Sequence, residues 1–123
     1  LAHVYLICIE QIGPLGEMIR LSRDQLNQNP GLRHSYFFIA VCVAPFAEEF
    51  LFRGLFFRAL DKEWGGWKAL LGSSAFFVIY HPPISWLPVG VLGVLNAYIF
   101  KKTGRLAPAV ALHMVYNAVV LAW

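Results

Sequence analysis

The sequence predicts an all-α fold in which several apolar helices pack as a bundle inside a membrane. Hydrophobic residues make up 59% of the 123 residues and charged residues only 14%, whereas soluble domains lie nearer a half and a quarter. A domain of this size is mostly surface, so this many apolar side chains need lipid as part of their solvent. No stretch alternates apolar and polar residues as a strand does. We therefore expect a multi-span transmembrane helical bundle with about four or five apolar helices.

Five apolar segments account for these helices, at about 1–19, 36–60, 66–81, 84–100 and 106–123. A helix needs ~20 residues to cross the hydrocarbon, with ~17 as a lower limit. The second, fourth and fifth segments meet this requirement, and the first is borderline. The third is short enough to be a partial or tilted span.

Residues that break helices separate the five segments, and tryptophans lie at segment ends as in an interfacial aromatic belt. The breakers are Asn29-Pro30-Gly31, Gly65-Gly66, Pro82-Pro83 and Thr103-Gly104. The sequence begins at Leu1, inside an apolar run. We therefore interpret residues 1–123 as a single membrane-embedded domain that is a fragment of a longer chain.

The basic residues flank the apolar segments, and the net charge is +3. Lysine and arginine in the connections between spans are typical of membrane proteins. They form no stripe along one face, which argues against nucleic-acid binding. Membrane lipid is thus the first partner that we expect.

The polar residues that are most costly to bury in a membrane lie inside the second segment, where Glu48, Glu49 and Arg53 interrupt an apolar run. Ionisable residues in a span usually face the protein interior and mark function. Glu49 and Arg53 are four residues apart and can pair on one helix face, whereas Glu48 lies about 100° around the helix. Glu48 is therefore the freer carboxylate and the candidate general base. The alternative is that the group only ties helices together.

Two further places put polar side chains in apolar segments. His81 ends the third segment directly before Pro82-Pro83, where a histidine at the lipid interface is the simpler interpretation. His113 and Asn117 are again four residues apart and share a helix face. A single polar residue of this kind is often a contact between helices, and we interpret Asn96 in that way.

These signatures together resemble the CPBP family of membrane proteases, which includes the CAAX prenyl endopeptidases and the Abi or bacteriocin-immunity proteins. Three motifs of the family occur in order: EExxxR at 48–53, FxxxH at 77–81 and HxxxN at 113–117. The resemblance covers about residues 36–120, which we expect to form the catalytic core. It implies an integral, multi-pass protein of a membrane, expected to be a prokaryotic plasma membrane.

The resemblance also implies roles for the motif residues. Glu48, with His81, would activate the water that attacks a peptide carbonyl, while Glu49 and Arg53 hold the site in shape. His113 and Asn117 would bind a metal or stabilise the oxyanion. No cofactor is certain, but Glu48, His81 and His113 would suffice as ligands of a catalytic zinc, as in a metalloendopeptidase. The absence of an HEXXH motif favours the glutamate-type alternative.

The expected function is hydrolysis of a peptide bond in a membrane-associated substrate, either a lipidated CAAX-type peptide or a peptide processed in bacteriocin immunity. Two alternatives stay open at this point. The buried Glu and His residues could belong to a transporter that relays protons or ions, although no internal repeat supports it. They could also belong to an inactive scaffold.

Overall fold

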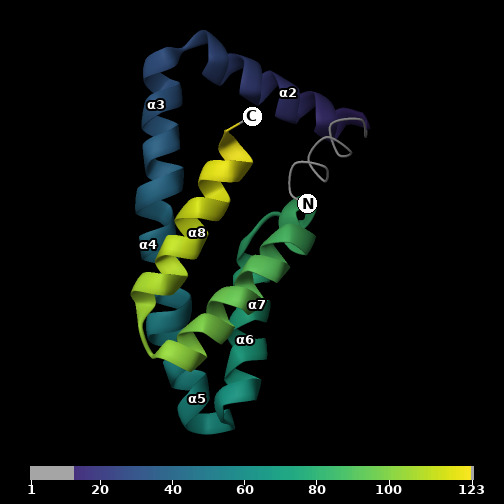
Figure 1. The fold of residues 1–123 in the computed structure, drawn as a ribbon. Helices are drawn as coiled ribbons and strands as arrows, with labels where there is room; N and C mark the ends of the chain where they lie inside the picture. The colour runs from purple at the N-terminus through teal and green to yellow at the C-terminus, as the bar shows by residue number, and fades with distance from the viewer. Residues whose placement is uncertain (1–12, 123) are drawn as a thin grey trace.

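A computed structural model describes residues 13–122, and every regular element among them is a helix (Figure 1). The prediction of an all-α bundle is confirmed. Residues 1–12 of the first predicted segment lie outside the described residues. Its end, from residue 13, belongs to α2 (Gly13–Gln28), which crosses one end of the bundle.

The second predicted segment is part of one continuous helix from Pro30 to Trp64, 35 residues long. Its successive parts are α3 (Pro30–Phe38), η1 (Ile39–Val43), α4 (Ala44–Glu49), η2 (Phe50–Phe57) and α5 (Arg58–Trp64). Pro30 occupies the first turn, where its missing N–H costs no hydrogen bond. The parts η1 and η2 are π-helical, a geometry that is rare and often found at functional sites.

The three remaining long helices follow the predicted breakers closely. They are α6 (Gly66–Tyr80), α7 (Trp86–Thr103) and α8 (Leu106–Leu121), with the short 3₁₀ turn η3 (Pro83–Ser85) before α7. Gly65 and Gly104 adopt positive φ angles of 82° and 66°, which a glycine tolerates without strain. These two residues end α5 and α7.

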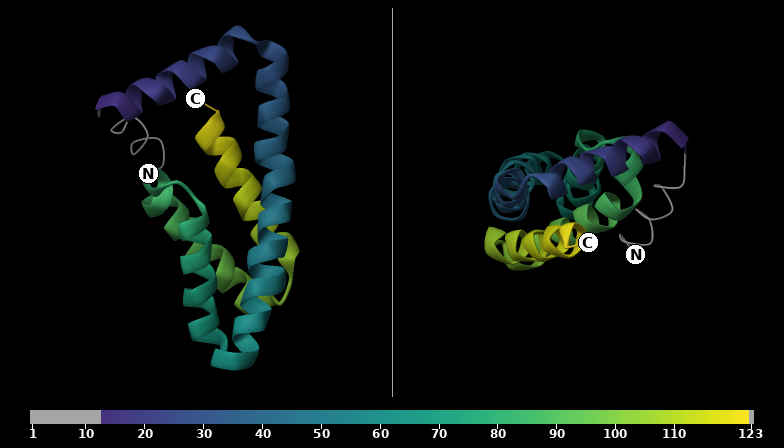
Figure 2. Two further views of the ribbon diagram at one scale, coloured as in Figure 1. Left: turned by 180° about the vertical axis from the view of Figure 1, so that it is seen from behind. Right: turned by 90° about the horizontal axis from the view of Figure 1, so that it is seen from above.

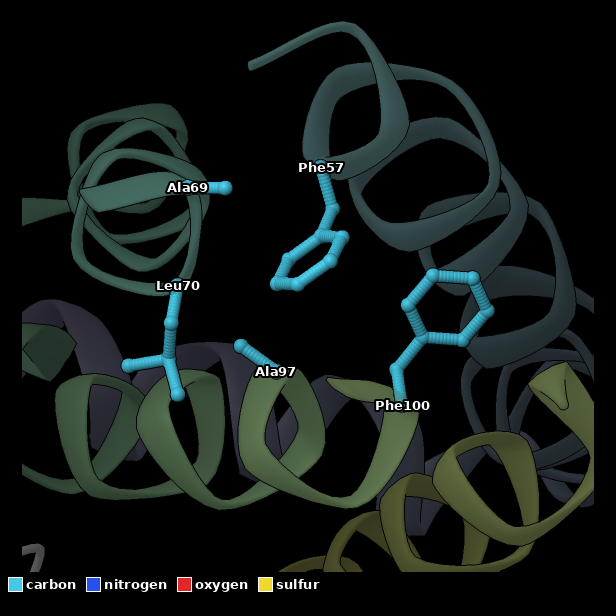
Figure 3. Packing of buried hydrophobic residues seen from close by; sticks show 5 residues of the cluster. All are labelled: Phe57, Ala69, Leu70, Ala97 and Phe100. Atoms are coloured by element: carbon cyan, nitrogen blue, oxygen red, sulfur yellow. The ribbon is translucent and has the colours of Figure 1, made fainter. Parts of the chain in front are cut away.

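The helices pack as antiparallel neighbours in chain order. From the α5–α6 turn, at the end of the bundle opposite α2, α6 runs back alongside the long helix and α7 returns beside it (Figures 1 and 2). Phe57, Ala69, Leu70, Ala97 and Phe100 form a buried cluster between the long helix, α6 and α7 (Figure 3). Ala69 and Ala97 are fully buried, and such small residues let helices approach closely.

The outer surface of the bundle is apolar. Phe46, Ile79 and Leu87, on three different helices, have exposed fractions of 63%, 67% and 61%. Two of the described helices, Pro30–Trp64 and Pro83–Thr103, are long and apolar enough to cross a membrane, whereas α8 is a shorter apolar helix. Large apolar side chains that face outward from helices of this kind are expected in lipid, where they cost no exposure to water.

Candidate active site

Glu48 and Glu49 follow each other on the long helix, yet their side chains have different surroundings. Glu49 is fully buried, whereas the Glu48 side chain keeps an exposed fraction of 20%. Consecutive residues of a helix point about 100° apart. The two carboxylates therefore belong to two different parts of the site.

Glu49 is the centre of a buried polar network. Its Oε1 atom accepts hydrogen bonds from Arg53 Nη1 at 3.2 Å, from Asn96 Nδ2 at 2.7 Å and from His113 Nδ1 at 2.9 Å. One carboxylate oxygen thus joins the long helix to α7 and α8. The pairing of Glu49 with Arg53 is the one that their spacing predicts.

Arg53 is also fully buried and is held from three sides. Besides its bond to Glu49, it donates from Nη2 to the carbonyl oxygen of Gly93 at 2.6 Å. Its guanidinium lies 4.5 Å from the centre of the Phe77 ring. A Cβ atom at Gly93 would come within 3.1 Å of Phe77 Cδ1, so a glycine on α7 lets that helix approach α6 and Arg53 closely.

Glu48 faces both imidazoles of the predicted site. Its Oε2 atom lies 3.6 Å from His81 Nε2 and 3.7 Å from His113 Nε2. These separations are too long for direct hydrogen bonds. Among the described residues, no group makes a hydrogen bond to the buried Oε2 atom of Glu48. This carboxylate oxygen is thus free to bind a group that lies beside it and contacts the two rings as well.

The other ring nitrogens determine how the imidazoles face Glu48. His81 Nδ1 lies 2.8 Å from the carbonyl oxygen of Phe77; because a carbonyl only accepts, Nδ1 carries the hydrogen. His113 Nδ1 donates in the same way to the Glu49 carboxylate. In each neutral ring, Nε2 is then an acceptor that faces Glu48. A water molecule can donate two hydrogen bonds, so it can bind to two of these acceptors, the Glu48 carboxylate and the two Nε2 atoms.

Asn117 binds the backbone of the long helix. Its Nδ2 atom donates to the carbonyl oxygen of Ala40 at 2.8 Å. In η1 the Ala44 N–H bonds back to the Ile39 carbonyl oxygen, five residues earlier. In that register the partner of the Ala40 oxygen would be the N–H of residue 45, which proline lacks. Asn117 therefore supplies the donor that Pro45 cannot, and it holds α8 against the long helix.

The effect of removing Asn117 on stability should depend on residue 45. Asn117→Ala leaves the Ala40 carbonyl oxygen unpaired, which should cost about 1–3 kcal/mol of unfolding free energy. In a Pro45→Ala background, the new backbone N–H of residue 45 can bond to the Ala40 oxygen. The loss of unfolding free energy caused by Asn117→Ala should therefore be clearly smaller in that background. Unfolding of all four proteins in detergent micelles measures the difference. Equal costs in the two backgrounds would contradict this role of Asn117.

A cavity of about 290 Å³ joins four of the six predicted residues. Glu48, His81, His113 and Asn117 line this cavity. Glu49 and Arg53 do not line it. Arg53 bonds to Glu49, and Glu49 bonds to His113 at the cavity surface. Most of the other lining residues are apolar. The residues are Tyr36, Ala40, Glu48, His81, Ile84, Ser85, Pro88, Val89, Leu92, His113, Tyr116, Asn117, Val120 and Leu121.

Two side chains of this site were not among the predicted site residues. Asn96 is fully buried and makes the expected contact between helices, but its partner is the Glu49 carboxylate of the predicted site. Tyr116 lines the cavity beside Asn117. Its position three residues after His113 places it on the same helix face, so this spacing was the signal available in the sequence.

The glutamate-type and zinc alternatives differ in what binds beside Glu48, His81 and His113. These side chains are the carboxylate and two imidazoles that would hold a catalytic zinc, and their Oε2 and Nε2 atoms face one another. Between residues 13 and 122, no three His, Cys, Asp or Glu side chains form a preformed metal site. The chemistry below is derived for the protein groups and water.

A comparison with protein families identifies the chain. The model of the family described as type II CAAX prenyl endopeptidase Rce1-like matches residues 30–119, well over half of the chain. This range includes all three motifs and confirms the resemblance to the CPBP and CAAX proteases. No match was found among curated proteins or solved structures. The chain therefore belongs to the Rce1-like family of type II CAAX prenyl endopeptidases, which are integral membrane proteases.

Proposed function

We propose that this chain is a glutamate-type endopeptidase in which Glu48 activates water to cleave a membrane-associated, CAAX-type peptide. The observation that carries this proposal is that one Glu48 oxygen lies 3.6 and 3.7 Å from two imidazole nitrogens. A carboxylate beside two imidazoles in an apolar cavity is suited to take a proton from water. The hydroxide then attacks the carbonyl carbon of the scissile bond.

His81 assists this first step. Its Nδ1–H is engaged by the Phe77 carbonyl oxygen, so its Nε2 lone pair faces the water that Glu48 binds. The water proton can move to Glu48 or to His81. It then passes to the nitrogen of the leaving amine as the peptide bond breaks, which balances the protons of the hydrolysis.

His113 and Asn117 serve the oxyanion of the tetrahedral intermediate. The Glu49 carboxylate at 2.9 Å from His113 Nδ1 fixes the orientation of this ring. His113 donates to the oxyanion from Nε2 after this nitrogen has taken up a proton from the solvent, and it keeps that proton while the water proton passes to the leaving amine. Asn117 uses one Nδ2 hydrogen for the Ala40 oxygen and has a second to donate. Donors fixed before the reaction stabilise developing negative charge most effectively.

The cavity limits which part of the substrate enters. Its volume of about 290 Å³ is at the low end of the ~300–1,000 Å³ that is usual for ligand pockets. It therefore suits the few residues around the scissile bond, while a lipid anchor on the substrate stays in the membrane. The long apolar helices support a multi-pass protein, and the resemblance to Abi proteins favours a prokaryotic plasma membrane.

Cleavage in the presence of a metal chelator tests this proposal. The purified full chain should release the C-terminal tripeptide from a prenylated CAAX-type peptide, and excess chelator should leave the rate unchanged. Glu48 then activates water without a metal. Loss of activity that added zinc restores would contradict the glutamate-type mechanism. Failure to cleave any such peptide would contradict the choice of substrate.

A further inference from the structure

A second concave site lies at the end of the bundle opposite α2. It is a pocket of about 500 Å³ formed where α5 turns into α6 and where α7 ends. We call it the basal pocket. The residues that line it are Phe57, Arg58, Asp61, Lys62, Gly66, Phe100, Lys101 and Gly104. None of them lines the candidate active site.

Aromatic rings form the buried floor of the basal pocket. Phe57 and Phe100 meet edge to face with ring centres 5.4 Å apart, and Figure 3 shows both rings between the helices. Both side chains are almost fully buried, with exposed fractions of 4%. The pocket therefore offers an apolar surface at its base.

Two cations near this floor each lie over an aromatic ring. The Arg58 guanidinium lies 5.5 Å from the centre of the Phe100 ring, and Lys101 Nζ lies 4.8 Å from that of Trp67. A cation over an aromatic ring is held by electrostatic attraction. These two charges are therefore more ordered than lysines and arginines that extend freely into solvent.

Gly66 has no side chain, and this leaves space for the Lys101 side chain to extend over the Trp67 ring. A Cβ atom on Gly66 would lie 2.7 Å from Lys101 Cε and 3.5 Å from Asp61 Oδ1. Any larger residue would push the lysine stem aside. The first residue of α6 thus leaves room for the Lys101 side chain, and a Cβ atom there would make the flexible end of that side chain move.

The charge of the whole chain is concentrated at this end. Residues 58–68 and 101–105 contain six basic residues and two acidic ones, a balance of +4, while the whole chain carries +3. Trp64 and Trp67 at the same end have exposed fractions of 54% and 62%. Exposed tryptophans beside lysines and arginines are typical of the membrane–water interface.

We propose that the basal pocket binds the phosphodiester headgroup of an anionic membrane phospholipid. The phosphate oxygens accept from Arg58, Lys62 and Lys101, which outnumber the one acidic lining residue, Asp61. The ring edges of Phe57 and Phe100 that reach the pocket contact the glycerol. A guanidinium binds phosphate with two parallel hydrogen bonds, and clusters of basic residues near the ends of membrane helices attract anionic lipids. This inference does not depend on the proposed catalytic roles.

Lipid-dependent thermal stability tests this site. The full chain in uncharged detergent is titrated with phosphatidylglycerol, with phosphatidylcholine or with inorganic phosphate, and the unfolding midpoint is followed. Phosphatidylglycerol alone should raise the midpoint with a saturating dependence, because a ligand of the folded state stabilises it. Equal shifts from phosphatidylcholine or inorganic phosphate would overturn the proposal.

Matched variants locate the binding. Lys101→Gln should weaken phosphatidylglycerol binding about fivefold. Lys102→Gln should not, because the Lys102 ammonium lies over Tyr98, at 5.6 Å, and outside the pocket. Gly66→Ala should weaken binding without a change of charge and serves as the second variant if Lys101→Gln does not fold. Equal weakening in Lys102→Gln and Lys101→Gln would show attraction to the whole basic end and overturn the proposal.

Discussion

Glu48→Gln should lower the rate of peptide cleavage by a factor of at least about 10²–10⁴, the usual contribution of a positioned general base. Glutamine has nearly the same shape as glutamate but cannot take a proton from water. The fold should persist, because the buried Oε2 atom of Glu48 makes no hydrogen bond within the described residues. Initial cleavage rates and unfolding midpoints of the two proteins measure both effects.

Glu63→Gln is the matched control for this experiment. Glu63 lies on the same long helix but is exposed on α5, so the same chemical change should leave the cleavage rate unaltered. A Glu48→Gln protein that keeps full cleavage would contradict the role of Glu48. Changed ion flux in sealed vesicles, without any effect on cleavage, would instead favour a transporter.

Arg53→Met should destabilise the protein by about 3–5 kcal/mol, the largest effect on stability that we expect. The change removes a fully buried charge and leaves the Glu49 carboxylate buried without its cation. It also leaves the Gly93 carbonyl oxygen without the donor at 2.6 Å. Chemical unfolding in detergent micelles measures this loss.

Arg105→Met is the control for Arg53→Met. Arg105 is exposed between α7 and α8, and exposed substitutions usually change stability by less than about 0.5 kcal/mol. The double variant Glu49→Gln with Arg53→Met should recover part of the loss, because no unpaired charge then stays buried and the amide oxygen at position 49 can still accept from Asn96 and His113. If Arg53→Met were as stable as Arg105→Met, the buried network would not hold the bundle together.

The fold was largely predictable from composition and from the residues that break helices. Gly65, Pro82-Pro83 and Gly104 mark helix ends in the structure as they do in the sequence. The two π-helical parts of the long helix were not predictable, because apolar periodicity over 36–60 does not distinguish a π turn from an α turn. The start at Pro30 was not predicted because Asn29-Pro30-Gly31 is typical of a loop and residues 33–35 are polar.

The candidate site was predictable where helix geometry alone decides it. The four-residue spacing of Glu49 and Arg53 places them together, and the 100° step separates Glu48 from them. The position of His81 could not be predicted in this way, because the sequence of its own helix does not show that its side chain faces Glu48 on a different helix. Asn96 makes the contact between helices that a single amide in a span usually makes, but the sequence does not show that its partner is Glu49. The bond from Asn117 to Ala40 depends on the π register before Pro45, which the sequence does not reveal.

The most direct test of this account is the separation of Glu48, His81 and His113 in an experimental map of the full chain in lipid. We expect Glu48 Oε2 to lie close to both Nε2 atoms, near the separations of 3.6 and 3.7 Å in the structure. We also expect all three side chains to face one cavity. Imidazoles that point into the lipid, or that lie too far from Glu48 to share a water molecule with it, would contradict this account.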